Sequence, residues 1–128
     1  MRCLIVDDSA DFVDAARGLL ERDGIVVVGV ASSGTEALAR FEELRPDVTL
    51  VDIDLGCESG FDVVELLHRA GTPSPSPLIL ISTHAPLEFA DMVAASPALG
   101  FVSKSALSVD AIGDLVRVAA AFEESDHR

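Results

Sequence analysis

Five short, predominantly apolar runs alternate along this chain with segments of helical periodicity. The runs are Cys3–Val6, Ile25–Val30, Val48–Val51, Leu78–Ile81 and Leu99–Val102. Continuous apolar runs of this length are typical of strands that are buried on both faces. Strands that alternate with helices through short connections form a parallel sheet with right-handed crossovers and helices on both faces. The pattern therefore predicts an α/β fold of five βα units, a three-layer sandwich around a five-stranded parallel sheet.

The segments between the runs carry signals for the start and end of each helix. The first helix ends near Gly24, and the second begins at Ser33-Gly34-Thr35-Glu36 and ends before Pro46. The third ends near Gly71, and the fourth, about residues 86–95, has the weakest apolar stripe. The fifth aligns Ile112, Leu115, Val116, Ala119 and Phe122 on one face. We expect one domain over residues 1–122 and a frayed polar tail over 123–128.

Composition excludes several classes of function. The chain has 128 residues, enough for one domain with a hydrophobic core. A net charge of −13 argues against nucleic acid as a partner, since phosphate binding relies on clustered Lys and Arg. No apolar stretch is long enough to cross a bilayer. Cys3 and Cys57 follow no metal-ligand spacing, so we expect reduced thiols and a cytoplasmic protein.

Polar side chains follow four of the five predicted strands. Asp7 and Asp8 come after the first, Asp52 ends the third, Ser82 follows the fourth, and Lys104 lies just beyond the fifth. In open α/β sheets, ligands bind outside the carboxyl ends of the strands, where the strand order reverses. If the order is the common 2-1-3-4-5, the first and third strands are neighbours. The three carboxylates would then converge in one crevice flanked by the serine and the lysine.

This set of residues suits phosphoryl transfer to a carboxylate. Three close carboxylates ionise together only at high cost without a counter-ion, and Mg²⁺ is a cation that carboxylates and phosphate oxygens share. Lys104 is the one lysine among nine basic residues and offers a compact positive charge, while Ser82 offers a hydroxyl donor. Taken singly, each residue also has an ordinary interpretation as a helix cap, a loop residue or a surface charge. Together they favour Asp52 as the reactive centre of a Mg²⁺-dependent site.

Four short motifs extend this interpretation to a family. They are Asp7-Asp8, Asp52-Ile-Asp-Leu-Gly-Cys-Glu-Ser-Gly60, Ser82-Thr83 and Phe101-Val-Ser-Lys104. With these motifs, nearly the whole chain resembles a response-regulator receiver domain of two-component signalling. The resemblance implies a flavodoxin-like fold with strand order 2-1-3-4-5. It also implies a signalling switch, not an enzyme, that takes a phosphoryl group from a histidine kinase.

The resemblance assigns a role to each site residue. Asp52 would be the phospho-acceptor, and Ser82 and Lys104 would hold the phosphoryl oxygens. Asp8 would bind Mg²⁺ directly and Asp7 largely through water. The backbone carbonyl of Asp54 would be a further Mg²⁺ ligand. Phe101 would be an aromatic switch that turns inward as Ser82 moves. Asp54 and His84 would control the lifetime of the phosphoryl group.

Partners follow from the same resemblance. We expect a sensor histidine kinase or a phosphotransfer protein, and a second copy of the chain through the surface formed by the fourth helix, fifth strand and fifth helix. The ending Gly-Phe-Val-Ser-Lys-Ser-Ala-Leu, residues 100–107, is similar to receivers attached to helix-turn-helix output domains. We therefore expect a stand-alone receiver or a fragment of a transcriptional regulator.

Three positions depart from the family pattern, and three alternatives stay open. Gly56 and Ser105 stand where proline is usual, and Phe101 lacks the frequent hydroxyl. Asp52-Ile-Asp54 also fits a small Mg²⁺-dependent phosphohydrolase of the haloacid-dehalogenase type, although the order of motifs along the chain differs. A Toprim-like nuclease shares acidic strand ends but suits so acidic a chain poorly. The third alternative is a receiver that is never phosphorylated and acts by docking.

Overall fold

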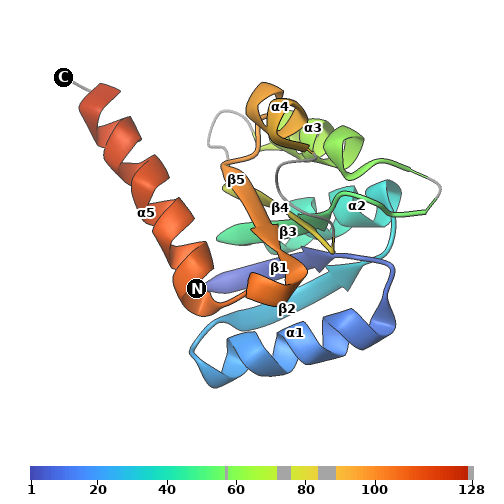
Figure 1. The fold of residues 1–128 in the computed structure, drawn as a ribbon. Helices are drawn as coiled ribbons and strands as arrows, with labels where there is room; N and C mark the ends of the chain where they lie inside the picture. The colour runs from blue at the N-terminus through green and yellow to red at the C-terminus, as the bar shows by residue number, and fades with distance from the viewer. Residues whose placement is uncertain (57, 72–75, 84–88, 127–128) are drawn as a thin grey trace.

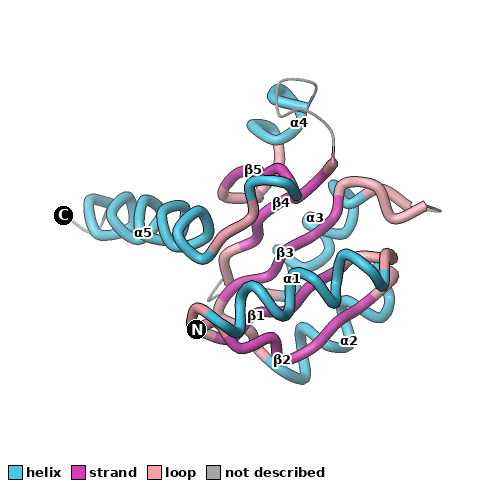
Figure 2. The backbone as a smooth tube through the Cα atoms, turned by 60° about the horizontal axis from the view of Figure 1, so that its bottom comes forward, coloured by secondary structure: helices cyan, strands magenta, loops and turns pink. Residues whose placement is uncertain are grey.

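Five parallel strands form the central sheet, flanked by five helices (Figures 1 and 2). The computed structural model describes residues 1–56, 58–71, 76–83 and 89–126, with side chains described as far as Arg117. The strands, in spatial order, are β2 (Val26–Ala31), β1 (Arg2–Val6), β3 (Val48–Asp52), β4 (Leu78–Ser82) and β5 (Gly100–Ser103). The helices are α1 (Ala10–Arg22), α2 (Gly34–Leu44), α3 (Gly60–Ala70), α4 (Ala90–Ala95) and α5 (Val109–Asp126). The predicted fold and strand order are confirmed.

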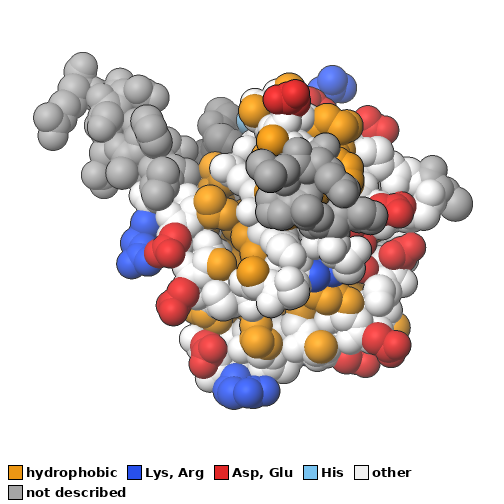
Figure 3. Space-filling model, viewed as in Figure 1, with side chains coloured by type: hydrophobic (Ala, Val, Ile, Leu, Met, Phe, Trp, Pro, Cys, Tyr) orange, Lys and Arg blue, Asp and Glu red, His pale blue; other side chains and the backbone are white. Residues whose placement is uncertain are grey.

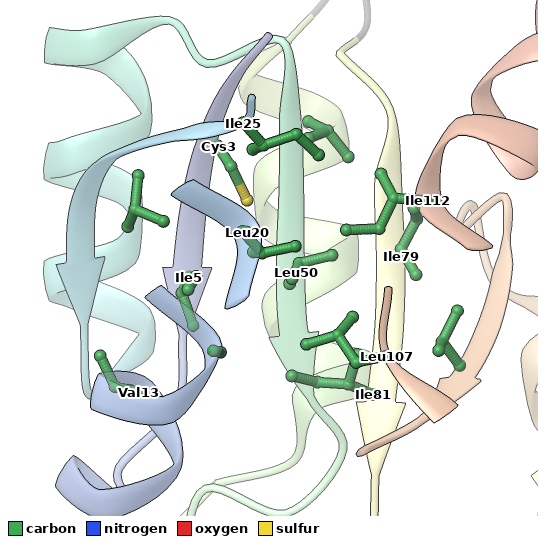
Figure 4. Packing of buried hydrophobic residues seen from close by; sticks show 14 residues of the cluster. Cys3, Ile5, Val13, Leu20, Ile25, Leu50, Ile79, Ile81, Leu107 and Ile112 are labelled. Atoms are coloured by element: carbon green, nitrogen blue, oxygen red, sulfur yellow. The ribbon is translucent and has the colours of Figure 1, made fainter. Parts of the chain in front are cut away.

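The sheet separates two hydrophobic layers because neighbouring side chains of a strand point to opposite faces. On one face, Cys3 and Ile5 of β1 pack with the buried side of α1 and with the start of α5 (Figure 4). On the other face, Leu4 and Val6 pack with α2 and α3. The strands β1, β3 and β4 are almost wholly apolar because both of their faces are covered.

Side-chain caps fix where the helices begin at the edge of the sheet that carries the polar residues. The hydroxyl oxygens of Ser9, Ser33 and Ser59 accept hydrogen bonds from the backbone N–H groups near the start of α1, α2 and α3. α1 is followed by Gly24, whose φ of 101° lies in the left-handed region, as the predicted stop requires. α2 ends on Arg45, also left-handed with a φ of 46°.

The structure gives the last two helices the bounds Ala90–Ala95 and Val109–Asp126. α4 begins at Ala90, and the expected start at residues 86–88 lies outside the described residues. α5 continues to Asp126, so it takes in the beginning of the segment 123–128 that we expected to be a frayed tail. Its later turns project away from the body of the domain (Figures 1 and 2). The domain boundary at residue 122 stays a prediction.

Acidic side chains outnumber basic ones on the face of the molecule shown in Figure 3. Figure 3 shows Asp and Glu spread around one face of the molecule, with Lys and Arg at few places on it. This distribution agrees with the net charge of −13. Among the described residues, no helix has both the length and the apolar character that crossing a bilayer requires.

Candidate functional site

Strand register brings the predicted site residues together. Val6 of β1 pairs with Val51 of β3, so Asp7 and Asp52, one residue further along each strand, lie side by side. Asp52 pairs in turn with Ile81 of β4, which places Ser82 one step beyond that pair. Ser82 pairs with Ser103 of β5, and Lys104 follows directly. The carboxyl ends of four adjacent strands thus deliver the acids, the serine and the lysine to one edge of the sheet.

Lys104 joins the acids at the centre of this site. Its Nζ lies 2.7 Å from Oδ2 of Asp7 and 3.2 Å from Oδ2 of Asp52. Nζ also lies 4.3 Å from the centroid of the Phe12 ring, close enough for a cation–π contact. The lysine is therefore held between two carboxylates and an aromatic face of α1.

The three carboxylates form a compact group. One side-chain oxygen each from Asp7, Asp8 and Asp52 lies within 4.8 Å of the others. Asp7 and Asp52 are buried, with exposed fractions of 2% and 6%, whereas Asp8 is exposed. The Oδ1 atom of Asp7 accepts a hydrogen bond from the backbone N–H of Ser9, 2.8 Å away. The Oδ2 atom of Asp7 is buried and faces the Lys104 ammonium without a well-aligned hydrogen bond.

The ionisation of Asp52 and Lys104 reflects this crowding. Burial raises the pKa of Asp52 above its ordinary value, and the negative charge of Asp7 adds to the rise. The backbone N–H of Asp54, 3.2 Å from Asp52 Oδ1, and the Lys104 ammonium oppose the rise without cancelling it. Burial lowers the pKa of Lys104, but its contacts with Asp7 and Asp52 outweigh burial, and the net shift is upward. A single lysine therefore compensates the acidic group only in part.

The donor set fits a hard divalent cation. Three carboxylates are present within reach of one another, one of them exposed, and a buried oxygen of Asp7 lacks an aligned donor. Proteins usually bind Mg²⁺ through a small number of carboxylate oxygens of this kind. A cavity of about 390 Å³ opens beside Asp7 and Asp8 between α1 and the start of α2. The acidic group is therefore suited to hold a metal ion.

Gly60 lets the start of α3 pack closely against the end of β3, next to Asp52. A Cβ atom at this position would lie 2.0 Å from the carbonyl oxygen of Asp52 and 2.8 Å from Cα of Ile53. The backbone N–H of Gly60 donates to the carbonyl of Ile53 over 2.7 Å. The start of α3 can therefore approach the end of β3 this closely only with glycine at position 60. This contact explains why a glycine follows Asp52 eight residues later.

The remaining predicted residues fall into three groups. Ser82 is buried at the end of β4, and Phe101 is half-buried against the layer formed with α3 and α4. Asp54 is exposed and reaches the site through its backbone N–H. His84 lies outside the described residues.

Two contacts near the site were not anticipated. The ring of Phe12, near the start of α1, lies against the Lys104 ammonium. Glu58, in the loop after β3, accepts a hydrogen bond from the backbone N–H of Gly34 at the start of α2. The sequence offered no signal for either contact, because both join residues far apart along the chain through the shape of the folded sheet.

Comparison with known proteins agrees with this geometry. The profile of the response regulator receiver domain matches residues 3–116. A proposed transcriptional regulator from Pseudomonas aeruginosa is 34% identical over 103 residues, which cover 80% of this chain and 49% of that protein. A protein-glutamate methylesterase/protein-glutamine glutaminase from Carboxydothermus hydrogenoformans is 41% identical over 86 residues, which cover 65% of this chain and 23% of that protein. The chain thus spans about half of the first relative and about a quarter of the second.

Solved structures place the fold in the same group. A CheY-like response regulator receiver domain from Methanospirillum hungatei JF-1 superposes with a TM-score of 0.77 at 26% identity, over 97% of each chain. The relatives include proteins with different output functions, so they favour no single output class. Receiver domains are signalling modules rather than enzymes, and the phosphohydrolase alternative finds no support. The profile match, the relatives and the acidic site together show that this chain belongs to the response-regulator receiver family of two-component signalling.

Proposed function

We propose that this chain is a phosphorylation switch in which Asp52 accepts a phosphoryl group from a sensor histidine kinase or a phosphotransfer protein. The observation that carries the proposal is the contact of Lys104 with both Asp7 and Asp52 inside an acidic group at the carboxyl edge of the sheet. A cation in contact with the acceptor is what an incoming phosphoryl group requires, since the reaction depends mainly on positioning and charge neutralisation.

The proposed reaction transfers the phosphoryl group between two side chains. A carboxylate oxygen of Asp52 forms a bond to phosphorus while the phosphorus–nitrogen bond of the donor phosphohistidine breaks. The imidazole nitrogen leaves with the electron pair of that bond. Lys104, which follows β5, and the Ser82 hydroxyl, at the end of β4, would hold the phosphoryl oxygens. The backbone N–H of Asp54, which donates to Asp52 Oδ1, keeps the carboxylate oriented.

Mg²⁺ is the proposed cofactor. Asp7, Asp8, Asp52 and the backbone carbonyl of Asp54 would hold it, with Asp8 as a direct ligand and Asp7 acting largely through water. When bound, Mg²⁺ would offset the charge of the phosphoryl oxygens. The exposed position of Asp8 beside the cavity supports its role as the more accessible ligand.

The proposed response to phosphorylation passes through Ser82 and Phe101. Leu80 of β4 pairs with Phe101 of β5, and Ser82 lies two residues beyond Leu80. Because side chains alternate along a strand, Ser82 and Phe101 point to the same face of the sheet. A shift of Ser82 towards the phosphoryl group would vacate space on that face for the Phe101 ring, and so change the surface formed by α4, β5 and α5. A second copy of the chain would bind this surface.

Two finer assignments belong to the same proposal. Asp54 and His84 would flank the path of the water that hydrolyses the acyl phosphate, and so set its lifetime. The similarity of the segment 100–107 to receivers of helix-turn-helix proteins supports either a stand-alone receiver or a fragment of a transcriptional regulator.

Incubation with a small phosphodonor tests the function. With Mg²⁺ and acetyl phosphate, intact-protein mass spectrometry should show one added phosphoryl group, and omission of Mg²⁺ should abolish it. Asp52→Asn should remove the added group, while the control Asp62→Asn, an exposed aspartate in the first turn of α3, should retain it. An adduct that survives in Asp52→Asn, or sustained phosphate release without an adduct, would contradict the proposal.

A further inference from the structure

The loop after Asp52 has a tightly bonded shape. Asp54 and Ser59 form an isolated antiparallel bridge, and the backbone N–H of Leu55 donates to the carbonyl of Glu58 over 3.2 Å. At the tip, the N–H of Gly56 donates to Oδ1 of Asp54 over 3.0 Å, with a left-handed φ of 80°. These contacts join residues 54–56 to residues 58–59, which together are called the hairpin here, and the hairpin carries the carbonyl of Asp54 proposed as a metal ligand.

The tip of this loop lies directly against the acidic group. A Cβ atom at Gly56 would be 3.4 Å from Oδ2 of Asp8. The position of the loop therefore fixes how close its backbone comes to the exposed carboxylate. Hydrogen bonds within the hairpin define its shape, but they do not define its position relative to Asp8, which comes from a different strand.

Glu58 supplies a connection from this hairpin to a fixed helix. Its Oε1 accepts a hydrogen bond from the backbone N–H of Gly34, the first residue of α2. Its Oε2 lies 2.7 Å from the point where a Cβ of Gly34 would be, so the carboxylate approaches only because position 34 is glycine. The start of a helix favours a carboxylate through its free N–H groups and its dipole. α2 is itself held in the core by the buried residues Ala37 and Phe41.

We propose that Glu58 is a positioning residue that anchors the hairpin to the start of α2 and so sets the geometry of the Mg²⁺ site. This inference rests on the proposed function, because it concerns the metal on which phosphoryl acceptance depends. Glu58 does not touch the reacting atoms. It acts through the loop, by holding the Asp54 carbonyl and Gly56 beside Asp8.

A purely structural role for Glu58 makes a different prediction. If Glu58 only capped α2, its loss would lower stability and leave Mg²⁺ affinity unchanged. Glu36 provides the matched control, since its Oε1 also accepts from a backbone N–H at the start of α2, that of Ser32, over 3.0 Å. Glu36 also lines the cavity beside Asp7 and Asp8, so its removal controls for the loss of one negative charge near the acids.

The test measures Mg²⁺ affinity in the unphosphorylated chain, by titration followed through backbone amide NMR shifts. Glu58→Ala should weaken Mg²⁺ binding about ten-fold, the lower end of what outer contacts of metal sites contribute. Glu58→Gln should restore most of the affinity, because its amide oxygen can still accept from Gly34. Glu36→Ala should stay within about two-fold of the wild type, as expected of a solvent-screened charge. The inference would be overturned if the Mg²⁺ affinity of Glu58→Ala stayed within about two-fold of the wild type. It would also be overturned if Glu36→Ala lost as much Mg²⁺ affinity as Glu58→Ala.

A second variant breaks the anchor from the other side. In Gly34→Ala, the new methyl group would displace the Glu58 carboxylate, while alanine remains a good helix residue. It should weaken Mg²⁺ binding as Glu58→Ala does, and the double variant should be no weaker than either single one. Additive losses would contradict a shared anchor. NMR spectra of each variant would be recorded to check that it is folded. In Glu58→Ala, the Gly34 amide should lose protection from hydrogen exchange.

The two proposals fail in distinguishable ways. If the wild type accepts a phosphoryl group and Glu58→Ala binds Mg²⁺ normally, only the anchor is wrong. If the wild type binds Mg²⁺ but accepts no phosphoryl group, the proposed function fails and the affinity comparison still tests the anchor. If the wild type binds no Mg²⁺, both are contradicted.

Discussion

Gly60 is the residue at which a single added methyl group should disturb the site most. In Gly60→Ala, the Cβ atom would lie 2.0 Å from the carbonyl oxygen and 2.8 Å from the carbonyl carbon of Asp52. Both obstructing atoms belong to the backbone, so no side chain can rotate out of the way. The start of α3 and the end of β3 would have to separate by roughly 1.5 Å to reach an ordinary contact distance.

The cost can be worked from three contributions. Overpacking of this kind destabilises by about 1–3 kcal/mol, and a backbone obstruction belongs at the upper end. Separation would also weaken the hydrogen bond from Gly60 to Ile53, worth about 1 kcal/mol. The higher helix propensity of alanine offsets at most about 1 kcal/mol of this loss in the free energy of unfolding. We therefore expect Gly60→Ala to lower the free energy of unfolding by about 2–3 kcal/mol.

Urea unfolding, extrapolated linearly to water, measures this change. Gly18→Ala is the matched control, since Gly18 lies inside α1 with no atom within 4 Å of the added Cβ. It should be stabilised by about 0.5–1 kcal/mol through helix propensity alone. The reasoning would be refuted if Gly60→Ala unfolded within about 0.5 kcal/mol of the wild type, the usual range of surface substitutions. It would be refuted equally if both variants lost the same stability.

Three further predictions concern buried groups. The Thr49 hydroxyl is buried without a partner among the described residues, so Thr49→Val should stabilise by about 1 kcal/mol in urea unfolding; a loss would contradict this. Burial raises the pKa of Cys3 to about 12, so in a Cys57→Ser background a thiol reagent should react roughly a thousand-fold faster after unfolding, and similar rates would contradict this. The raised pKa of Asp52 means that its ionised form weakens the fold at neutral pH. In EDTA, Asp52→Asn should therefore have a larger free energy of unfolding than the wild type. The difference should shrink as the pH falls through the raised pKa of the folded state towards 3.8. A difference that does not change with pH would contradict this prediction.

The fold could be predicted from the sequence because its signals are local and repeated. Each central strand is buried on both faces, so apolar residues predominate in it without alternating with exposed polar ones. Each of the first three helices begins at a serine cap. α4 was the exception: none of its described residues is buried, so the periodicity there carried little information about where it begins.

The sequence was enough to predict which residues form the site, but not how these residues contact one another. The rule that ligands bind at the carboxyl ends of parallel strands was enough to group Asp7, Asp52 and Lys104. It did not reveal that Lys104 lies closer to Asp7 than to Asp52, because that depends on the path of the chain after β5. The contacts of Phe12 and Glu58 likewise depend on how α1 and α2 pack, which no local pattern encodes.

Location of the phosphoryl group on the chain tests the central claim most directly. After reaction with a phosphohistidine donor and Mg²⁺, borohydride reduction converts an acyl phosphate on aspartate to homoserine, which tandem mass spectrometry places in the sequence. We predict homoserine at position 52 and at no other aspartate. Homoserine at another position, or a phosphoryl group that resists borohydride, would contradict the assignment of Asp52 as the acceptor.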